Sequence, residues 1–267
     1  MPTFNLSVYR VFAAAVLLFA TSNITLAQLS SNCAGLGDNG NFSIVIDTVA
    51  TNIGVINDAG GGTTDLTGYN TYQLFLQCES SNDLLQAVGG DSFNPVTIQS
   101  TTSFFQAAFG TAIEPNSSLF APFPQVQYDS FVTIGLEATA ISENGEASTQ
   151  VIEDASSPIS GAFENGQDLV INTTIGGTWY ITDAELATNC TAGDDLKVPF
   201  AQVTTDGNIS GNVQFQVYRN GTQSSANCLR PYLHFLDGGC LDPLACNYDT
   251  MVSFDDGSCN YLSLIHI

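Results

Sequence analysis

Short runs of alternating apolar and polar residues, separated by turn residues, constrain this chain most strongly. In residues 69–78, YNTYQLFLQC, the side chains of Tyr72, Leu74 and Leu76 fall on one face of an extended strand. In residues 212–219, NVQFQVYR, Val213, Phe215 and Val217 do the same. Similar runs predict strands at residues 42–50, 95–101, 131–139, 168–174, 178–182 and 197–205. The pattern predicts an all-β fold, a two-sheet sandwich of jelly-roll type.

The connections between these runs carry their own signals. An Asp-Gly pair in residues 204–211 predicts a hairpin that joins the last two strands. Residues 82–89 and 101–110 each end in glycine and predict short helices. Residues 57–68 form a Gly-rich break, and the Pro-rich residues 110–130 predict a long loop over the sheet. We therefore expect helices only in the connections.

The two ends of the chain differ from the middle. Residues 1–27 resemble an export signal, with Arg10 before the apolar run VFAAAVLLFA and cleavage expected after Ala27. The run is too short to span a membrane, and no later stretch is longer. We expect a secreted, extracellular protein with a sandwich domain at residues 28–235 and a small disulfide-linked module at residues 236–267.

The charge of the chain limits its partners. Four basic residues face 26 acidic ones, a formal net charge of −22. Phosphate backbones are bound by clusters of basic side chains, so the charge excludes a nucleic-acid partner.

Seven cysteines in an exported chain predict disulfides. They are Cys33, Cys78, Cys190, Cys228, Cys240, Cys246 and Cys259. We expect Cys190–Cys228 in the sandwich and Cys246–Cys259 in the tail, with Cys33 bonded to Cys78, bonded to another molecule or free. Zinc is disfavoured because the tail lacks paired Cys-x-x-Cys ligands.

The tail resembles a known cysteine module. Its segment GCLDPLACNYDTMVSFDDGSC, residues 239–259, is similar to a repeat found in secreted and surface proteins of aquatic bacteria and some algae. Residues 63–136 more weakly resemble the sandwich that accompanies such modules. The resemblance implies no catalytic activity; it implies a building block of surface fibres or matrices.

The same segment is rich in oxygen ligands. Asp242, Asn247, Asp249, Asp255 and Asp256 could supply several of the six to eight oxygens that calcium requires. The spacing does not follow the EF-hand pattern. Calcium is therefore one hypothesis, and solvated loop acids are the other.

Asparagine sequons suggest attached glycans. Asn-x-Ser/Thr occurs at Asn41, Asn116, Asn172, Asn189, Asn208 and Asn220. Asn189 is the doubtful position, because the neighbouring Cys190 is expected in a disulfide. Occupancy requires a eukaryotic source.

The sequence gives no support for an enzyme. The segment VGGDSF, residues 88–93, superficially matches a Gly-Asp-Ser block, but neither His234 nor His266 has an aspartate three residues before it. Without a histidine base, Ser92 has no activating partner. We interpret this segment as a turn after the short helix.

Two functions remain as hypotheses. The first is a non-enzymatic structural subunit of an extracellular glycosylated fibre or matrix that donates residues 42–50 to the sheet of the next copy. The alternative for that strand is the first strand of its own sandwich. The second is a carbohydrate-binding or adhesion module in which Trp179, Tyr180 and Tyr218 stack on sugars, although a lone tryptophan is more often buried.

Overall fold

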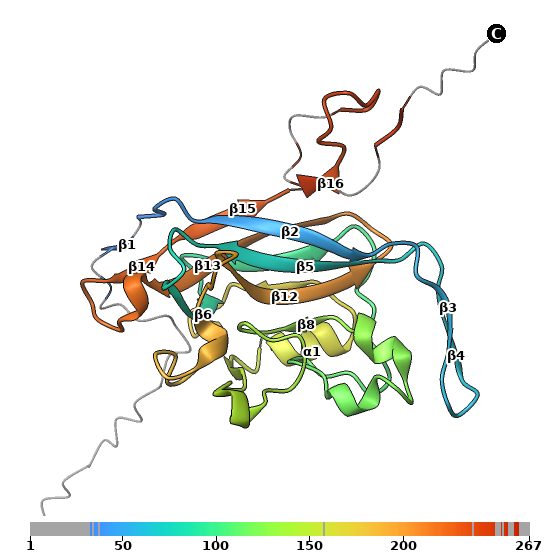
Figure 1. Cartoon of the computed structure of the whole chain (residues 1–267), viewed down its shortest axis with the longest axis horizontal. Coiled ribbons are helices and arrows are strands. Elements are labelled where there is room, and N and C mark those ends of the chain that lie inside the picture. Colours follow the sequence, from blue (N-terminus) through green and yellow to red (C-terminus); the bar gives the residue numbers. More distant parts are fainter. Residues whose placement is uncertain are drawn as a thin grey trace, which may run out of the picture.

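In the computed structural model the chain forms two main β-sheets that face each other, with antiparallel pairing throughout except between β1 (Gly35–Leu36) and β14 (Cys228–Arg230) (Figure 1). The structure describes residues 33, 35–36, 38–156, 158–236, 238–248, 252, 254–255 and 259–261. The expected export signal lies outside these residues. The all-β prediction is confirmed, and the two facing sheets agree with a sandwich. The jelly-roll connectivity stays a prediction.

The smaller sheet has four strands. In spatial order they are β2 (Ser43–Ala50), β5 (Asn70–Gln77), β12 (Lys197–Thr205) and β8 (Phe131–Val132). In β5, Tyr72, Leu74 and Leu76 are buried and the residues between them are partly exposed, as the alternation predicts.

The larger sheet has nine strands in the described part of the chain. Its main path runs through β1 (Gly35–Leu36), β14 (Cys228–Arg230), β13 (Ile209–Tyr218), β6 (Leu84–Gly90), β11 (Gly177–Tyr180) and β9 (Gln150–Glu153). The remaining strands are β7 (Val96–Ser100), β10 (Leu169–Ile171) and β15 (Tyr232–Phe235). The long strand β13 pairs in turn with β14, β15, β6 and β7.

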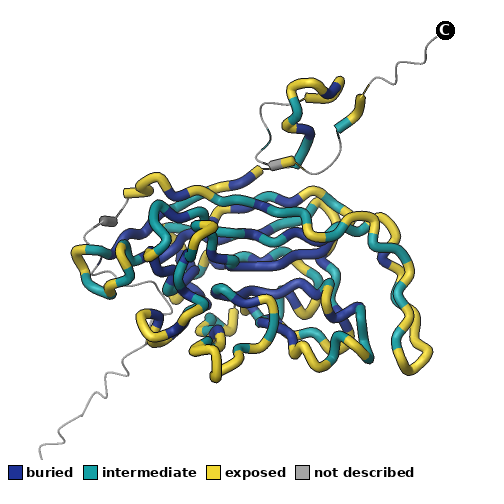
Figure 2. Tube along the Cα trace, viewed as in Figure 1, coloured by how far each residue is buried: buried dark blue, intermediate teal, exposed yellow. Residues whose placement is uncertain are grey.

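The core lies between the two sheets. Phe200 of β12 and Phe215 of β13 meet edge to face with ring centroids 5.0 Å apart. Trp179 of β11 is fully buried, and its Nε1 donates to the carbonyl oxygen of Phe200 at 3.1 Å. Figure 2 shows the buried residues concentrated along these strands, with exposed residues in the connections.

The predicted hairpin at residues 204–211 is wrong. The two strands that flank the Asp-Gly turn, β12 and β13, lie in different sheets. β12 pairs with β5 and β8, whereas β13 pairs with strands of the larger sheet. Both strands bury nearly all their residues, so each is stabilised by its own neighbours in a sheet and the turn crosses between the layers.

Both predicted short helices are also wrong. Residues 84–90 form the interior strand β6, which is paired on both sides by β13 and β11. Asp83, expected near a helix start, instead accepts the backbone N–H groups of Glu79 and Ser80 in the preceding turn. Residues 101–110 form a loop whose Phe104 bridges to Thr205. Pairing across the sheet outweighs local helix preference here.

Two other segments differ in extent. The predicted strand 131–139 shortens to the two residues of β8, after which the N–H groups of Thr133 and Gly135 still bond to carbonyls of β12. A projecting hairpin of β3 (Gly54–Asn57) and β4 (Thr63–Leu66) begins just before the Gly-rich break and includes most of it (Figure 1). Its Asp58 accepts the N–H groups of Gly60 and Gly62 at the turn, which explains why a Gly-rich segment is ordered.

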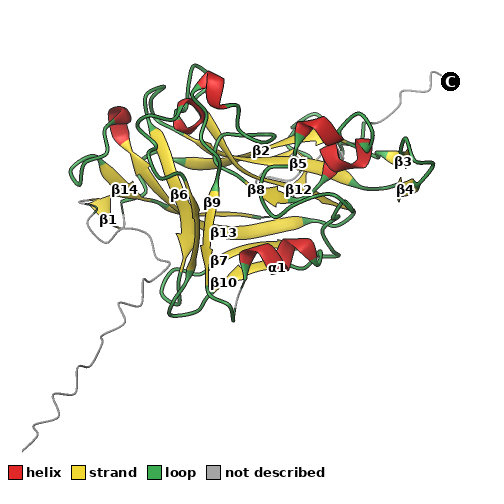
Figure 3. Cartoon of the chain, turned by 90° about the horizontal axis from the view of Figure 1, so that it is seen from below, coloured by secondary structure: helices red, strands yellow, loops and turns green. Residues whose placement is uncertain are grey.

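Helices are short and lie in connections, as expected. They are α1 (Ile159–Glu164) and the 3-10 turns η1 (Ser117–Leu119), η2 (Pro124–Tyr128), η3 (Ser142–Asn144), η4 (Thr188–Cys190) and η5 (Arg219–Gly221). The Pro-rich segment 110–130 contains no strand, as predicted. Figure 3 shows α1 beside β10 and β7. Beyond β15, the tail contains a separate two-stranded sheet of β16 (Gly238–Gly239) and β17 (Phe254–Asp255).

Candidate functional site

The strand β2 forms one edge of the four-stranded sheet. Within the described residues it pairs with β5 alone, so the other side of its eight-residue backbone joins no ladder. Ile44 and Ile46 face the core, whereas Val45 and Asp47 face outward. A bulge interrupts the pairing between Thr48 and Ala50, and Asp47 pairs with Lys197 at 3.0 Å. The bulge and the charged side chain both hinder pairing of this edge with another strand. Both lie in the second half of β2, so the first half is the part with regular strand geometry.

A shallow pocket of about 280 Å³ lies beside the start of β2. It separates β2 from β15 of the other sheet, and Phe42, Ile44 and Leu233 supply its apolar lining. Asn39 closes one end, because its side chain both donates to the carbonyl and accepts from the N–H of Tyr232. β15 and β17 therefore lie close to β2, although neither forms a ladder with it in the described residues.

The segment before β2 is tied to its own sandwich. Cys33 forms a disulfide with Cys228 of β14. Glu79 accepts the N–H of Asn41 and also binds Arg219 at 2.8 Å. Of the two alternatives for residues 42–50, the structure has the strand in its own sheet. Its register against β5 runs from Ser43 to Ala50.

The predicted disulfide pairs are wrong. The structure pairs Cys33 with Cys228 and Cys240 with Cys259. Cys78 and Cys190 are unbonded and buried, and Cys246 is unbonded and exposed. Burial raises the pKa of both the Cys78 and the Cys190 thiols to about 12, so both stay protonated at neutral pH.

The acids of the tail are only partly described. Asp249 and Asp256 lie outside the described residues. Asp242 accepts the Tyr261 hydroxyl at 2.6 Å and the Leu244 N–H at 2.9 Å, and these bonds lower its pKa. Asn247 accepts the N–H of Asn260 at 2.7 Å, and Asp255 lies near the Cys259 sulfur. The described acids and cysteines form no group that could hold a metal ion, so the calcium hypothesis stays a prediction.

Five of the six sequons lie at exposed positions. These are Asn41, Asn116, Asn172, Asn208 and Asn220. Asn189 differs, because its side-chain amide links two loops: Nδ2 donates to the carbonyls of Ile134 and Ala147, and Oδ1 accepts the N–H of Ala147. The sequence reason for doubting this position was wrong, since Cys190 forms no disulfide. Glycosylation at Nδ2 would disrupt these bonds instead.

Glycan occupancy should follow this division. In a eukaryotic expression host, we expect glycopeptide mass spectrometry to find sugar on several of the five exposed sequons and none on Asn189. The variant Asn189→Asp should lower the free energy of unfolding by about 1–3 kcal/mol, because a carboxylate cannot donate to two buried carbonyls. Asn208→Asp, at an exposed turn, is the matched control. A fully occupied Asn189 in folded protein would contradict the structure.

The aromatic side chains proposed to contact sugars separate into two groups. Trp179 is fully buried, so it is a core residue and offers no surface for a ligand. Tyr180 and Tyr218 are partly exposed on the outer face of the nine-stranded sheet, and Tyr218 also packs against the hydrophobic core. The Tyr180 hydroxyl lies 3.3 Å from Gln150 Oε1, and the Tyr218 hydroxyl lies 2.9 Å from Gln216 Nε2.

The Gly-Asp-Ser segment forms a turn, but it follows a strand rather than the predicted helix. Asp91 accepts the N–H groups of Phe93 and Asn94, which closes the turn after β6. Ser92 is exposed. His234 lies on β15, where its register partner is Asn212.

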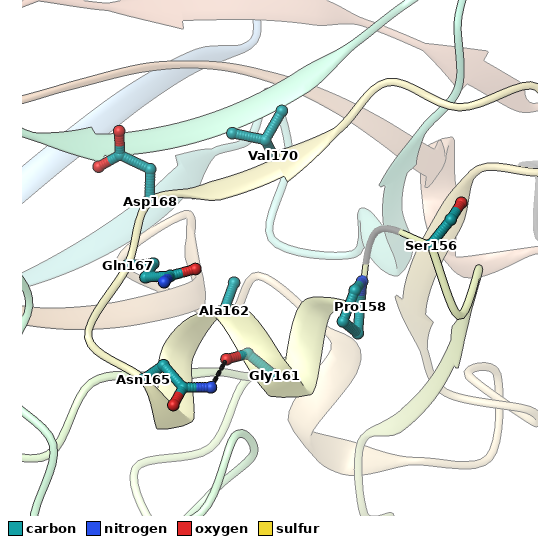
Figure 4. A pocket seen from close by; sticks show the side chains of 8 residues that line it. All are labelled: Ser156, Pro158, Gly161, Ala162, Asn165, Gln167, Asp168 and Val170. Atoms are coloured by element: carbon teal, nitrogen blue, oxygen red, sulfur yellow. Dashed lines mark hydrogen bonds between the residues drawn. The ribbon is translucent and has the colours of Figure 1, made fainter.

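A cavity of about 410 Å³ lies between α1 and β10 (Figure 4). It is lined by Ser156, Pro158, Gly161, Ala162, Asn165, Gln167, Asp168 and Val170. Its polar groups already serve the fold, since Asn165 Nδ2 donates to the Gly161 carbonyl and Asp168 accepts the N–H of Ser100. Its lining contains one hydroxyl, Ser156, and no histidine or cysteine, so these residues do not make a nucleophile–base pair.

Asp129 is a buried acid that the sequence analysis missed. Its carboxylate is fully buried and accepts the N–H groups of Ala107 at 2.8 Å and Thr111 at 3.0 Å. Burial raises its pKa to about 7, while the bonds from these backbone groups oppose the rise. In the sequence, YDS within a Pro-rich loop shows no sign of burial. Asp129 therefore links the end of the long loop to its start.

This buried acid should make stability depend on pH. The pKa of Asp129 is about 7 in the folded state, whereas the ordinary value is 3.8. The folded state therefore binds the proton more tightly than the unfolded state does. The stabilising contribution is complete below pH 4 and is lost as pH rises through about 7. The two pKa values differ by roughly three, so the contribution of Asp129 to the free energy of unfolding is at most about 4 kcal/mol. Thermal unfolding followed from pH 5 to 8 should show this decline, and Asp129→Asn should flatten it. An unchanged slope in the variant would contradict this assignment.

Comparison of the chain with protein-family models, curated proteins and solved structures finds no match in any of the three. In the described residues, no helix has the length and apolarity needed to cross a membrane.

Proposed function

We propose that this protein is a non-enzymatic, secreted structural protein, the subunit of an extracellular glycosylated fibre or surface matrix. The observation that carries the proposal is the edge strand β2, whose outer side joins no ladder in the described part of the chain. Unpaired backbone groups along a strand are a template for pairing with another chain. Copies would associate by adding strands at this edge.

Three further features support the proposal. The disulfide between Cys33 and Cys228 joins residues 195 positions apart and is typical of proteins that function outside the cell. Exposed sequons lie on several loops, which suits a glycosylated surface. The tail segment at residues 239–259 resembles modules of secreted and surface proteins.

The mode of assembly differs from strand donation. Because β2 is already paired with β5 and its leading segment is anchored by Cys33, releasing it would require breaking its ladder with β5. Pairing at the outer edge of β2 leaves that ladder intact. We therefore propose edge pairing between folded copies rather than exchange of the strand.

The test is an edge substitution with a matched control. Val45 lies in the regular part of β2 and faces outward, so Val45→Lys puts a charge at the edge without entering the core. Val55 of the projecting hairpin is 57% exposed and has no place in that edge, so Val55→Lys is the control. We expect the critical concentration for assembly to rise at least about tenfold for Val45→Lys, equivalent to 1.4 kcal/mol. Val55→Lys should assemble like the parent chain.

The outcomes separate the parts of the proposal. Electron microscopy of the secreted protein should show fibres or sheets for the parent chain and for Val55→Lys. If the parent chain stays monomeric at all concentrations, the structural function is wrong. If Val45→Lys assembles as readily as Val55→Lys, the fibre remains but the β2 edge is not its contact.

A further inference from the structure

One part of the outer surface is composed of neutral polar and aromatic side chains. It extends over β13, β6, β11 and β9, which are neighbours in that order in the nine-stranded sheet. We call it the tyrosine face and define it by Gln86, Ala87, Gln150, Ile152, Thr178, Tyr180, Gln216 and Tyr218. Ala87, Thr178 and Gln216 are buried among their larger neighbours, so the other five residues supply its exposed surface. The register places Tyr180 between Gln150 and Ala87, and Ala87 between Tyr180 and Gln216.

The orientation of the face follows from the strand period. Trp179 and Val88 are register partners and both point into the core. Tyr180 follows Trp179 and Ala87 precedes Val88. Because successive side chains of a strand point to opposite faces, Tyr180 and Ala87 must point outward. The hydrogen bond between Tyr180 and Gln150 places Gln150 on the same face. The pairing of β13 with β6 has a bulge that skips Gln86, so Gln86 can lie on the same face as the adjacent Ala87. Gln216 Nε2 contacts both Gln86 Oε1 at 2.7 Å and the Tyr218 hydroxyl at 2.9 Å, which places these three side chains on one face.

The two tyrosines flank Ala87, which is buried among the larger side chains around it. Ala87 lies between their strands and has the smallest side chain of the face. Neighbouring strands lie about 4.8 Å apart, and the Cα atoms of Tyr180 and Tyr218 are two strand spacings apart across the sheet. Tyr218 is also two residues further along β13 than Gln216, the residue in line with Tyr180. The two Cα atoms are therefore about 12 Å apart. This distance is similar to the span of a short oligosaccharide. The amide groups of Gln86 and Gln150 lie beside the tyrosines and are held by the bonds described above, whereas Gln216 is buried beneath them.

The absence of charge from this face is informative because the protein is so acidic. The chain has 26 acidic residues, yet every residue of the tyrosine face is neutral. A cationic ligand would find no carboxylate here, and a phosphate or sulfate ester would find no basic side chain. Tyrosine rings offer an apolar surface with a polar tip, and glutamine amides both donate and accept hydrogen bonds. A ligand with C–H faces and many uncharged hydroxyl groups fits this combination.

We propose that the tyrosine face binds a neutral polysaccharide. The rings of Tyr180 and Tyr218 stack on sugar rings, and the amides of Gln86 and Gln150 bond to their hydroxyl groups. The face is a sheet surface rather than a pocket, which suits an extended polymer. This binding is independent of the β2 edge, so it can hold whether or not copies assemble.

Binding to insoluble polysaccharides tests the proposal. The full chain is mixed with cellulose, insoluble starch or chitin, and the fraction bound is measured after sedimentation. The double variant Tyr180→Ala, Tyr218→Ala should lose at least about tenfold in affinity. Tyr248→Ala removes a tyrosine that is 43% exposed in the tail and is the matched control. Tyr180→Phe with Tyr218→Phe keeps the rings and should bind more weakly than the parent chain but better than the double alanine variant.

Several results would overturn the proposal. Thermal unfolding first establishes that the double alanine variant is folded, and the phenylalanine pair serves as the test if it is not. Absence of binding by the parent chain to all three polymers would refute a neutral polysaccharide ligand. So would equal binding by the parent and both double variants, or binding only to the anionic polymers alginate and heparin. Monomeric protein that binds through these tyrosines would reject the fibre but keep this site.

Discussion

Replacement of Trp179 by alanine is expected to lower the free energy of unfolding by about 3–5 kcal/mol, the usual cost of removing a fully buried large aromatic side chain. Trp179 has no exposed surface and lies between the two sheets. Its loss leaves a cavity and also leaves the carbonyl of Phe200 without the indole N–H that it accepts. Urea denaturation followed by circular dichroism measures the change.

The adjacent tyrosine is the control for this substitution. Tyr180 lies one residue further along β11 and points outward, so Tyr180→Ala should cost less than about 1 kcal/mol. Trp179→Phe should be intermediate, because it keeps much of the apolar volume but removes the donor. Equal costs at positions 179 and 180 would mean that the inner and outer faces of β11 are misassigned.

Removal of the Cys33–Cys228 disulfide should have an effect of similar size. The bond joins residues 195 positions apart, and in the chain-entropy model so long a loop gives about 5 kcal/mol of stabilisation. The double variant Cys33→Ser, Cys228→Ser should therefore lose most of that amount. It should also loosen the segment that leads into β2, because the same bond anchors it.

Two measurements check this result. Urea denaturation of the double variant gives the stability change, with Cys246→Ser as the control because Cys246 is exposed and unbonded. Peptide mapping without reduction should recover Cys33 linked to Cys228, and Cys240 linked to Cys259. Recovery of Cys190 linked to Cys228, as the sequence suggested, would contradict the structure.

The strands were predictable where the pattern is local. Alternation in residues 69–78 and 212–219 identified β5 and β13, because an extended strand turns every second side chain to the same face. Residues 84–90 were misread because Asn82 suggested a helix cap and Gly89 a helix end. The pairing of β6 with β11 and β13 cannot be recognised from the local sequence. The Asp-Gly turn after β12 was recognised correctly as a turn, but its strands join different sheets.

The candidate site was less accessible to sequence reasoning. Tyr180 and Tyr218 could be named as surface aromatics, but their common face depends on β6 lying between β11 and β13. The burial of Asp129 depends on the N–H groups of Ala107 and Thr111, about 20 residues away. The bonds that occupy the amide of Asn189 come from Ile134 and Ala147, which no local motif indicates.

The amino-acid sequence by itself determined the all-β character, the position of eight strands of the two main sheets and the acidic charge of this protein, because these depend on composition and on the two-residue period of a strand. Only the tertiary structure decided which strands pair, which cysteines bond and which strand is left at the edge. These features depend on contacts between residues that are tens to nearly two hundred positions apart, such as Cys33 with Cys228. A short stretch of sequence does not indicate which distant residues it will contact.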